Sequence, residues 1–245
     1  MRFDAVEICV TVVRFMLVMP WGRVGSNLLF AILRQSAPMK LANETFNTLK
    51  TAQEQEAWFH DFYEVAGAPP DRKYIGSKQS VRAMRDLPIM EGLLRDHSVR
   101  VVRLRRDNIV KAAISQIRAE QYAKQTERET GVGAWAVKKG DVPLGPTEID
   151  PNVLVPRTEI MEKFQSSMMN SFQGLDVLDI EYEEINSSLD DVVTRLRDFL
   201  GAPQSHFKVP FEKATPDNLR TAIANYSEVM HTLENTRFAQ WAKLD

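Results

Sequence analysis

A short turn that contains one arginine separates two apolar stretches of different period near the start of the chain. Residues 15–33 read FMLVMPWGRVGSNLLFAIL, which predicts a strand over residues 15–19, a turn, and a helix that Ser26 can cap. A helix N-terminus presents unpaired backbone N–H groups and the positive end of its dipole, so it attracts phosphate. Arg23 adds a permanent cation, and Asn27 adds a hydrogen-bonding side chain. The stretch indicates an anion site, and the alternative is an ordinary turn with a solvent-facing arginine.

This turn lacks the lysine of the familiar nucleotide-binding loop. In the pattern GxxxxGK[ST] a lysine follows the second glycine, whereas Ser26 follows Gly25 here. An ordinary ATP or GTP loop is therefore disfavoured. A small-molecule kinase of the P-loop class stays as an alternative function.

Strand-like and helix-like patterns alternate along most of the chain. Short apolar runs predict strands, and apolar residues at steps of three and four predict helices. This order implies an α/β fold with a central parallel sheet, helices on both faces and ligands at the carboxyl ends of the strands. A further stripe over residues 219–233 packs on the core or, as the alternative, forms a dimer seam. The predicted strands are residues 15–19, 73–77, 99–104 and 177–182, and the predicted helical stripes lie within 28–33, 110–117 and 189–199.

Length and composition fit a single domain over residues 1–245. The chain has 31 lysines and arginines against 33 acidic residues and a net charge of −2, so no overall positive field attracts nucleic acid. Its one cysteine, Cys9, excludes an internal disulfide, and its four histidines are too scattered to predict a metal site. No run is long enough to cross a bilayer. We expect a cytoplasmic monomer or homodimer, with residues 1–14 as an N-terminal extension.

One long segment, residues 129–151, interrupts the alternation and is rich in glycine and proline. Long irregular loops of this kind usually form lids or binding loops. Trp135 offers a stacking surface for a sugar ring or, alternatively, anchors the loop to the core. Lys78 follows the predicted strand 73–77 and is expected at the carboxyl edge, where it contacts a substrate or solvent. We therefore expect this loop and Lys78 to bind the substrate.

Three stretches resemble the motifs of sulfotransferases. Residues 20–29, PWGRVGSNLL, resemble the loop that binds the 5′-phosphosulfate of the donor. Residues 101–115, VVRLRRDNIVKAAIS, resemble the 3′-phosphate motif, in which a strand ends in arginine and the next helix bears a serine. Residues 181–184, EYEE, with KATP at 213–216, resemble the C-terminal half of bacterial and glycan-type members. Together the similarity covers most of residues 15–240.

The resemblance implies a three-layer, P-loop nucleotide-hydrolase-like fold and a donor, 3′-phosphoadenosine 5′-phosphosulfate, that leaves as 3′-phosphoadenosine 5′-phosphate without a metal. The distance along the chain from either Arg105 or Arg106 to Ser115 is longer than the family's usual spacing, so both arginines are candidates for the 3′-phosphate. Val24 stands where a serine is common. The donor-binding residues that the resemblance implies are Gly22, Arg23, Val24, Gly25, Ser26, Asn27, Ser115 and Lys213, with Arg105 or Arg106.

Sulfonyl transfer needs a cation for the leaving phosphate oxygen and a base for the acceptor proton. Arg23 can stabilise the growing negative charge electrostatically. A glutamate that one bacterial branch of the family carries after the loop is replaced by Ala31. The expected general base is therefore Glu44, with His60 as a second candidate. The alternative for Glu44 is an exposed glutamate at a helix start, and the alternative for His60 is a packed helix residue.

These motifs together predict a sulfotransferase that acts on a hydroxyl of a carbohydrate, lipid-linked or other small acceptor. Besides the kinase, a nucleotide-binding pseudoenzyme without transfer activity is an alternative, because Val24 and Ala31 depart from the family pattern.

Overall fold

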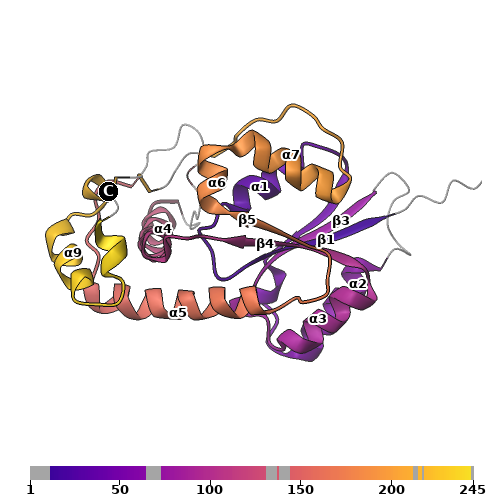
Figure 1. Ribbon diagram of the computed structural model, residues 1–245, viewed down its shortest axis with the longest axis horizontal. Coiled ribbons are helices and arrows are strands. Elements are labelled where there is room, and N and C mark those ends of the chain that lie inside the picture. Colours follow the sequence, from indigo (N-terminus) through magenta and orange to yellow (C-terminus); the bar gives the residue numbers. More distant parts are fainter. Residues whose placement is uncertain are drawn as a thin grey trace, which may run out of the picture.

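The computed structural model describes residues 12–64, 73–130, 137, 144–211, 215–216 and 218–243. Its centre is a five-stranded sheet in the order β2-β3-β1-β4-β5, and each neighbouring pair of strands is parallel. Parallel strands need crossover connections, and helices supply them on both faces (Figure 1). The predicted α/β fold with a central parallel sheet is confirmed. The strands are β1 (Val13–Met19), β2 (Met39–Asn43), β3 (Tyr74–Ser80), β4 (Val99–Arg105) and β5 (Val177–Glu181).

The observed strands differ from the predicted ones at a few points. β1 begins at Val13, inside the segment assigned to an N-terminal extension, because Val13 pairs with Tyr74 of β3. β3 continues to Ser80, so Lys78 lies within the strand instead of after it. β2 is absent from the prediction, since it is a short edge strand whose residues are half-buried or exposed. Cys9 lies outside the described residues.

Helices form one layer on each face of the sheet. In Figure 1, α1, α6 and α7 lie over one face and α2 and α3 over the other, while α4, α9 and one end of α5 gather beyond the carboxyl ends of the strands. The helices are α1 (Ser26–Leu33), α2 (Ala52–Tyr63), α3 (Leu87–Asp96), α4 (Ile109–Thr130), α5 (Pro151–Asn170), α6 (Tyr182–Ser187), α7 (Leu189–Leu200), α8 (Leu219–Ala222) and α9 (Tyr226–Glu234), with short 3₁₀ turns η1 (Thr45–Asn47), η2 (Val81–Ala83) and η3 (Ala239–Lys243).

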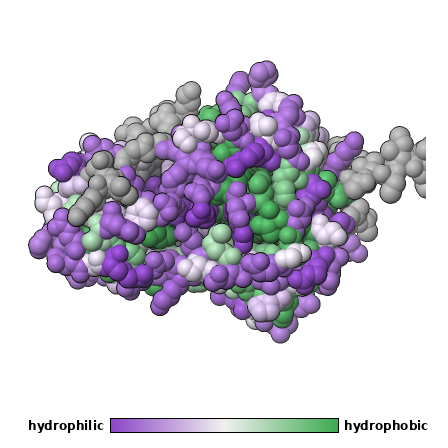
Figure 2. Space-filling view, viewed as in Figure 1, coloured by the Kyte–Doolittle hydropathy of each residue, from purple (hydrophilic) through white to green (hydrophobic). Residues whose placement is uncertain are grey.

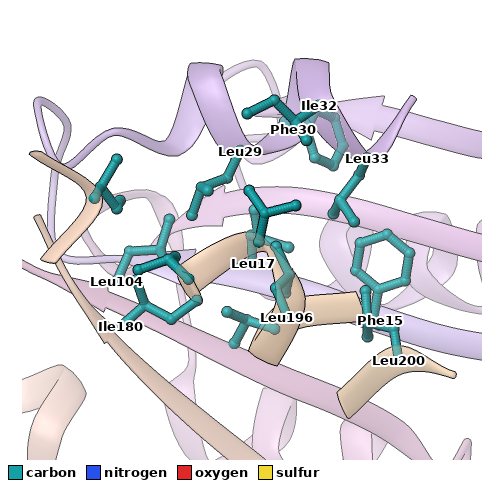
Figure 3. Packing of buried hydrophobic residues seen from close by; sticks show 14 of the residues in the cluster. Phe15, Leu17, Leu29, Phe30, Ile32, Leu33, Leu104, Ile180, Leu196 and Leu200 are labelled. Carbon is teal, nitrogen blue, oxygen red and sulfur yellow. The ribbon is translucent and has the colours of Figure 1, made fainter. Parts of the chain in front are cut away.

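The central strand β1 packs on both faces, which explains its continuous apolar sequence. Phe15 and Leu17 point into the cluster under α1 and α7 (Figure 3). Met16 and Val18 point into the cluster under α2 and α3. The Phe15 ring lies directly against Gly76 of β3 and leaves no room for a Cβ there. Strand β1 therefore packs against both helical layers, and this packing fixes the position of its carboxyl end.

A third apolar cluster joins α4, α5 and the C-terminal helices. The stripe over residues 219–233 belongs to this cluster, so it packs on the chain's own core. It forms two short helices, α8 and α9, instead of one. The segment 129–151 contributes a bridge between Thr147 and Ile223, and Trp135 lies outside the described residues. Of the predicted stripe, Leu219, Ile223, Met230 and Leu233 are buried, and Tyr226 is partly buried against the cluster.

The face in Figure 2 is mostly hydrophilic, and apolar side chains gather in its middle, around edge strand β5 and α7. Val177 and Leu178 of β5 are half-buried. In the part of the chain that the structure describes, no helix has the length and apolar character needed to cross a membrane.

Candidate functional site

The turn after β1 brings a left-handed backbone to the start of α1. Arg23 and Gly25 have φ angles of 65° and 78°. The prediction that Ser26 caps the helix is wrong: Gly25 occupies the N-cap position, and no side chain of the described residues caps this end. The carbonyl of Gly25 accepts the backbone N–H of Leu29 at 3.1 Å. Helix α1 thus begins with backbone N–H groups that lack intrahelical acceptors, as an anion site requires.

The sequence motifs around Arg23 and Ser115 meet in one cavity of about 300 Å³. Nε of Arg23 donates a hydrogen bond to Oγ of Ser115 at 3.0 Å. Thr215 donates to the same oxygen at 3.3 Å. Arg106 donates to the backbone carbonyl of Arg23 at 3.2 Å. The polar and aromatic residues that line the cavity are Arg23, Ser26, Asn27, Arg106, Ser115, Tyr182, Asn186, Phe211 and Thr215.

Two guanidinium groups give this cavity a positive field. Burial and the nearby charge of Arg106 lower the pKa of Arg23 to about 10, although Tyr182 opposes the shift. The pKa still lies far above neutrality, so Arg23 remains charged. The guanidinium of Arg106 lies over the Tyr182 ring at 4.1 Å, and its Nε is 3.9 Å from the Glu183 carboxylate.

Glu183 also organises the start of α4. Its carboxylate accepts the backbone N–H groups of Asp107 at 3.1 Å and Asn108 at 3.4 Å. An acidic side chain at a helix N-terminus satisfies backbone donors there. Glu183 therefore fixes the backbone on the C-terminal side of Arg106 while it contacts the arginine itself.

The structure separates the two arginines that the sequence left as alternatives. Arg105 is the last residue of β4 and pairs in register with Glu181 of β5, and its guanidinium forms an ion pair with the Glu181 carboxylate. Arg105 does not line the cavity, whereas Arg106 does. Successive side chains near a strand end point to opposite sides, so only one of the two reaches the cavity.

A polar chain, of which Lys78 is the buried member, connects the cavity to the end of β3. Lys78 is 1% exposed, and its ammonium group lies 2.9 Å from the Glu44 carboxylate and donates to the Asn27 side chain. Burial lowers the pKa of Lys78, while Glu44 acts in the opposite direction. Glu44 has a left-handed φ of 51° and accepts a second hydrogen bond from Asn47 at 3.1 Å. Asn27 lines the cavity, but Lys78 and Glu44 do not.

His60 does not belong to this site. It is exposed on the last turn of α2 and contacts His97, with Nδ1 and Nε2 3.1 Å apart. The neighbouring carbonyl of Tyr63 accepts a hydrogen bond from Arg14 at the start of β1. His60 is therefore near the amino ends of the strands, opposite to the cavity, because α2 runs antiparallel to them.

Other predicted donor contacts also differ. Val24 is 1% exposed and packs in the core beneath α1, so its side chain cannot take the place of a serine hydroxyl. Gly22 does not line the cavity; a Cβ there would lie 3.3 Å from Oε1 of Gln116. Lys213 and Trp135 lie outside the described residues.

Sequence reasoning missed several cavity residues. Tyr182 and Thr215 stand inside stretches that resemble the family, but neither stretch by itself indicates a role for them. Val209 and Phe211 follow α7 in an irregular segment, where no periodic pattern points to a site. Only the fold brings this segment against α1 and α6.

No protein-family model matches the chain, and no curated protein matches it. Several solved structures are similar in fold. A sulfotransferase from Alicyclobacillus acidocaldarius is 14% identical, with 93% of this chain and 92% of that chain covered and a TM-score of 0.46. Mouse sulfotransferase SULT7A1 complexed with PAP is 12% identical, with 94% and 87% covered and a TM-score of 0.47. At these values the likeness carries no argument about activity, which has to come from the residues of this chain.

Proposed function

We propose that this chain is a sulfotransferase that moves a sulfonyl group from 3′-phosphoadenosine 5′-phosphosulfate to a hydroxyl of a carbohydrate, lipid-linked or other small acceptor. One observation carries the proposal: the turn at Arg23 and the pair Arg106 and Ser115, which lie far apart in the sequence, line one cavity. The donor carries two separate anionic groups, a 3′-phosphate and a 5′-phosphosulfate, on the ribose of one nucleoside. A cavity with two arginines, a helix N-terminus and an apolar side suits such a molecule.

Each part of the cavity has a proposed role in donor binding. Arg23 and the first N–H groups of α1 hold the 5′-phosphate, and Arg106 with Ser115 holds the 3′-phosphate. Tyr182 and Phe211 contact the adenosine. When sulfur transfers, the bond between sulfur and the 5′-phosphate oxygen breaks and negative charge grows on that oxygen. Arg23 then stabilises the leaving group without giving up a proton.

The acceptor hydroxyl loses its proton as the new oxygen–sulfur bond forms. We assign this proton to Glu44, because the chain Glu44–Lys78–Asn27 connects a carboxylate to the cavity. Lys78 orients Glu44 through their ion pair and holds Asn27, which lines the cavity. His60 has no part in this scheme. Among the described residues no cluster of three metal-ligating side chains occurs, and the scheme uses no metal.

Thermal unfolding with and without ligands tests the donor site. We expect 3′-phosphoadenosine 5′-phosphate to raise the melting temperature more than ADP or ATP at equal concentration, because only the first ligand fills both anion positions. A larger shift with ATP favours the kinase alternative. Transfer of radiolabelled sulfonate from the donor to a panel of hydroxyl acceptors completes the test. Nucleotide binding without transfer to any acceptor favours the pseudoenzyme.

A further inference from the structure

Trp21, just before the Arg23 turn, carries two arginines on its ring. The guanidinium carbon of Arg82 lies 4.5 Å from the ring centroid, and that of Arg157 lies 5.1 Å from it. Phe164 of α5 contacts the same ring edge-on, with centroids 6.0 Å apart. Two guanidinium groups thus lie over the Trp21 ring, so this ring does not stack on a sugar. Instead, Trp21 holds arginines beside the site.

The two arginines differ in their charge balance. Arg157 forms hydrogen bonds with both carboxylate oxygens of Glu120, at 2.7 and 3.5 Å, so its charge is compensated. Arg82 is exposed. Within the described part of the chain, its guanidinium contacts the Trp21 ring and no carboxylate. The guanidinium N–H groups of Arg82 can therefore donate hydrogen bonds to a ligand.

The backbone holds Arg82 next to the turn. Its N–H donates to the carbonyl of Pro20 at 3.3 Å, and Ser80, two residues earlier, pairs with Met19. Trp21 and Arg23 are two residues apart, a span of about 7 Å at most. Arg82 is thus anchored at the same sheet edge as the proposed leaving-group cation. It does not line the donor cavity, which leaves it for the other substrate.

We propose that Arg82, held on Trp21, binds a negatively charged group of the acceptor, so that the acceptor is a hydroxyl compound that carries its own carboxylate or phosphate. The proposal rests on the proposed sulfotransferase function, since it concerns the second substrate of that reaction. A guanidinium presents a fork of N–H donors that matches both anions with two parallel hydrogen bonds. A neutral acceptor of the same shape leaves this fork unused.

Three sugars with the same ring test the charge preference: glucose, glucuronate and glucose 6-phosphate. Each is titrated into the full-length protein by NMR, with and without 3′-phosphoadenosine 5′-phosphate. We expect glucuronate, glucose 6-phosphate or both to bind about tenfold more tightly than glucose, and the two charged sugars distinguish carboxylate from phosphate. High ionic strength should reduce the preference, because Arg82 is exposed.

Two variants separate Arg82 from general surface charge. Arg82→Gln should bind all three sugars equally, whereas Arg85→Gln should keep the preference. Arg85 is the matched control because it is also exposed, lies three residues away, and contacts the carbonyl of Leu49 instead of Trp21. Melting temperatures check that both variants fold, and Arg82→Lys, which keeps the charge without the fork, should retain part of the preference.

Equal binding of the three sugars, no detectable binding of either charged sugar, or a preference that survives in Arg82→Gln overturns the proposal. Failure of the proposed function looks different. If the nucleotide causes no thermal shift while the charged sugars still bind through Arg82, the donor assignment fails and the anion site stands. If the nucleotide binds and the charge preference is absent, the acceptor proposal alone fails.

Discussion

Residues with left-handed backbone lie at both ends of the parallel strands, which we call the carboxyl edge and the amino edge of the sheet, but their surroundings differ. Beyond the carboxyl ends, Arg23 and Glu44 have φ angles of 65° and 51°, whereas near the amino ends Ser98 and Phe172 have 50° and 66°. Such backbone costs about 1–2 kcal/mol at a residue with a side chain. At the carboxyl edge this cost places a guanidinium and a carboxylate in polar contacts. At the amino edge it closes turns, and Phe172 is buried in the core. Among the described residues with positive φ, strain thus positions charged groups in polar contacts at the carboxyl edge.

Charged pairs at the two edges show the same contrast. Lys78 at the carboxyl edge is buried and meets Glu44, while Arg100 near the amino edge meets Asp176 at 3.3 Å with both side chains partly exposed. A buried cation depends strongly on its partner, and an exposed pair contributes little. If the carboxyl edge is the functional one, substitutions there should have larger effects than matched substitutions at the opposite edge.

The largest expected effect is the loss of activity in Arg23→Ala. Removal of a group that stabilises transition-state charge costs about 3–4 kcal/mol, or about a hundredfold or more in rate. We expect kcat for sulfonyl transfer to fall by this factor while the melting temperature changes little. Arg95→Ala, at an exposed arginine on the last turn of α3, should leave kcat unchanged. Near-normal turnover of Arg23→Ala would remove the leaving-group assignment.

Glu44→Gln should reduce both stability and turnover. The free energy of unfolding, measured by urea denaturation, should fall by about 1–3 kcal/mol, because the buried Lys78 ammonium loses its carboxylate. Asp176→Asn, at the exposed pair with Arg100, should cost less than about 1 kcal/mol. The nucleotide-induced thermal shift should persist in Glu44→Gln while kcat falls. Equal losses in the two variants would contradict the contrast between the edges.

Alanine substitutions at two glycines with positive φ distinguish the effect of backbone strain from an effect on the geometry of the site. Gly174 has a φ of 73° and open space where a Cβ would stand, whereas at Gly25, with a φ of 78°, a Cβ would lie 2.7 Å from Cδ1 of Ile185. Gly174→Ala should cost about 1 kcal/mol from backbone strain alone, and Gly25→Ala about 2 kcal/mol or more. Only Gly25→Ala should weaken nucleotide binding by calorimetry. Unchanged nucleotide affinity in this variant would speak against the cavity as the donor site.

The smallest expected effect concerns the histidine pair at the amino edge. Burial, followed by the nearby His60, lowers the pKa of His97 below 6.5. The unfolded chain therefore binds more protons at mildly acidic pH, so stability is lost as the pH falls through the pKa of the unfolded state towards that of the folded state. His97→Gln should flatten this part of the stability profile, and His206→Gln, at an exposed histidine after α7, should not. Activity at fixed pH should change in neither variant.

Much of the fold was predictable because apolar periodicity reports burial directly. The strands β1, β4 and β5 have apolar residues that pack in the core. Arg23 stands out because it is the one charged residue in the glycine-containing turn between β1 and α1. Edge strand β2 escaped prediction, since half-buried residues have no strong pattern. The assignment of His60 to the site rested on its residue type alone. The direction of α2 places it at the amino edge, opposite to the cavity.

Residue types and local spacing determined the α/β class, the turn before α1 and the candidates for anion binding, because these depend on neighbours along the chain. Tertiary structure decided that Arg106 and not Arg105 reaches the cavity, that Gly25 begins α1, and that Glu183 and Arg82 take part in contacts beside the site. These outcomes depend on which side of a strand a side chain faces and on which distant segments pack together. A single sequence encodes such contacts only through the whole fold.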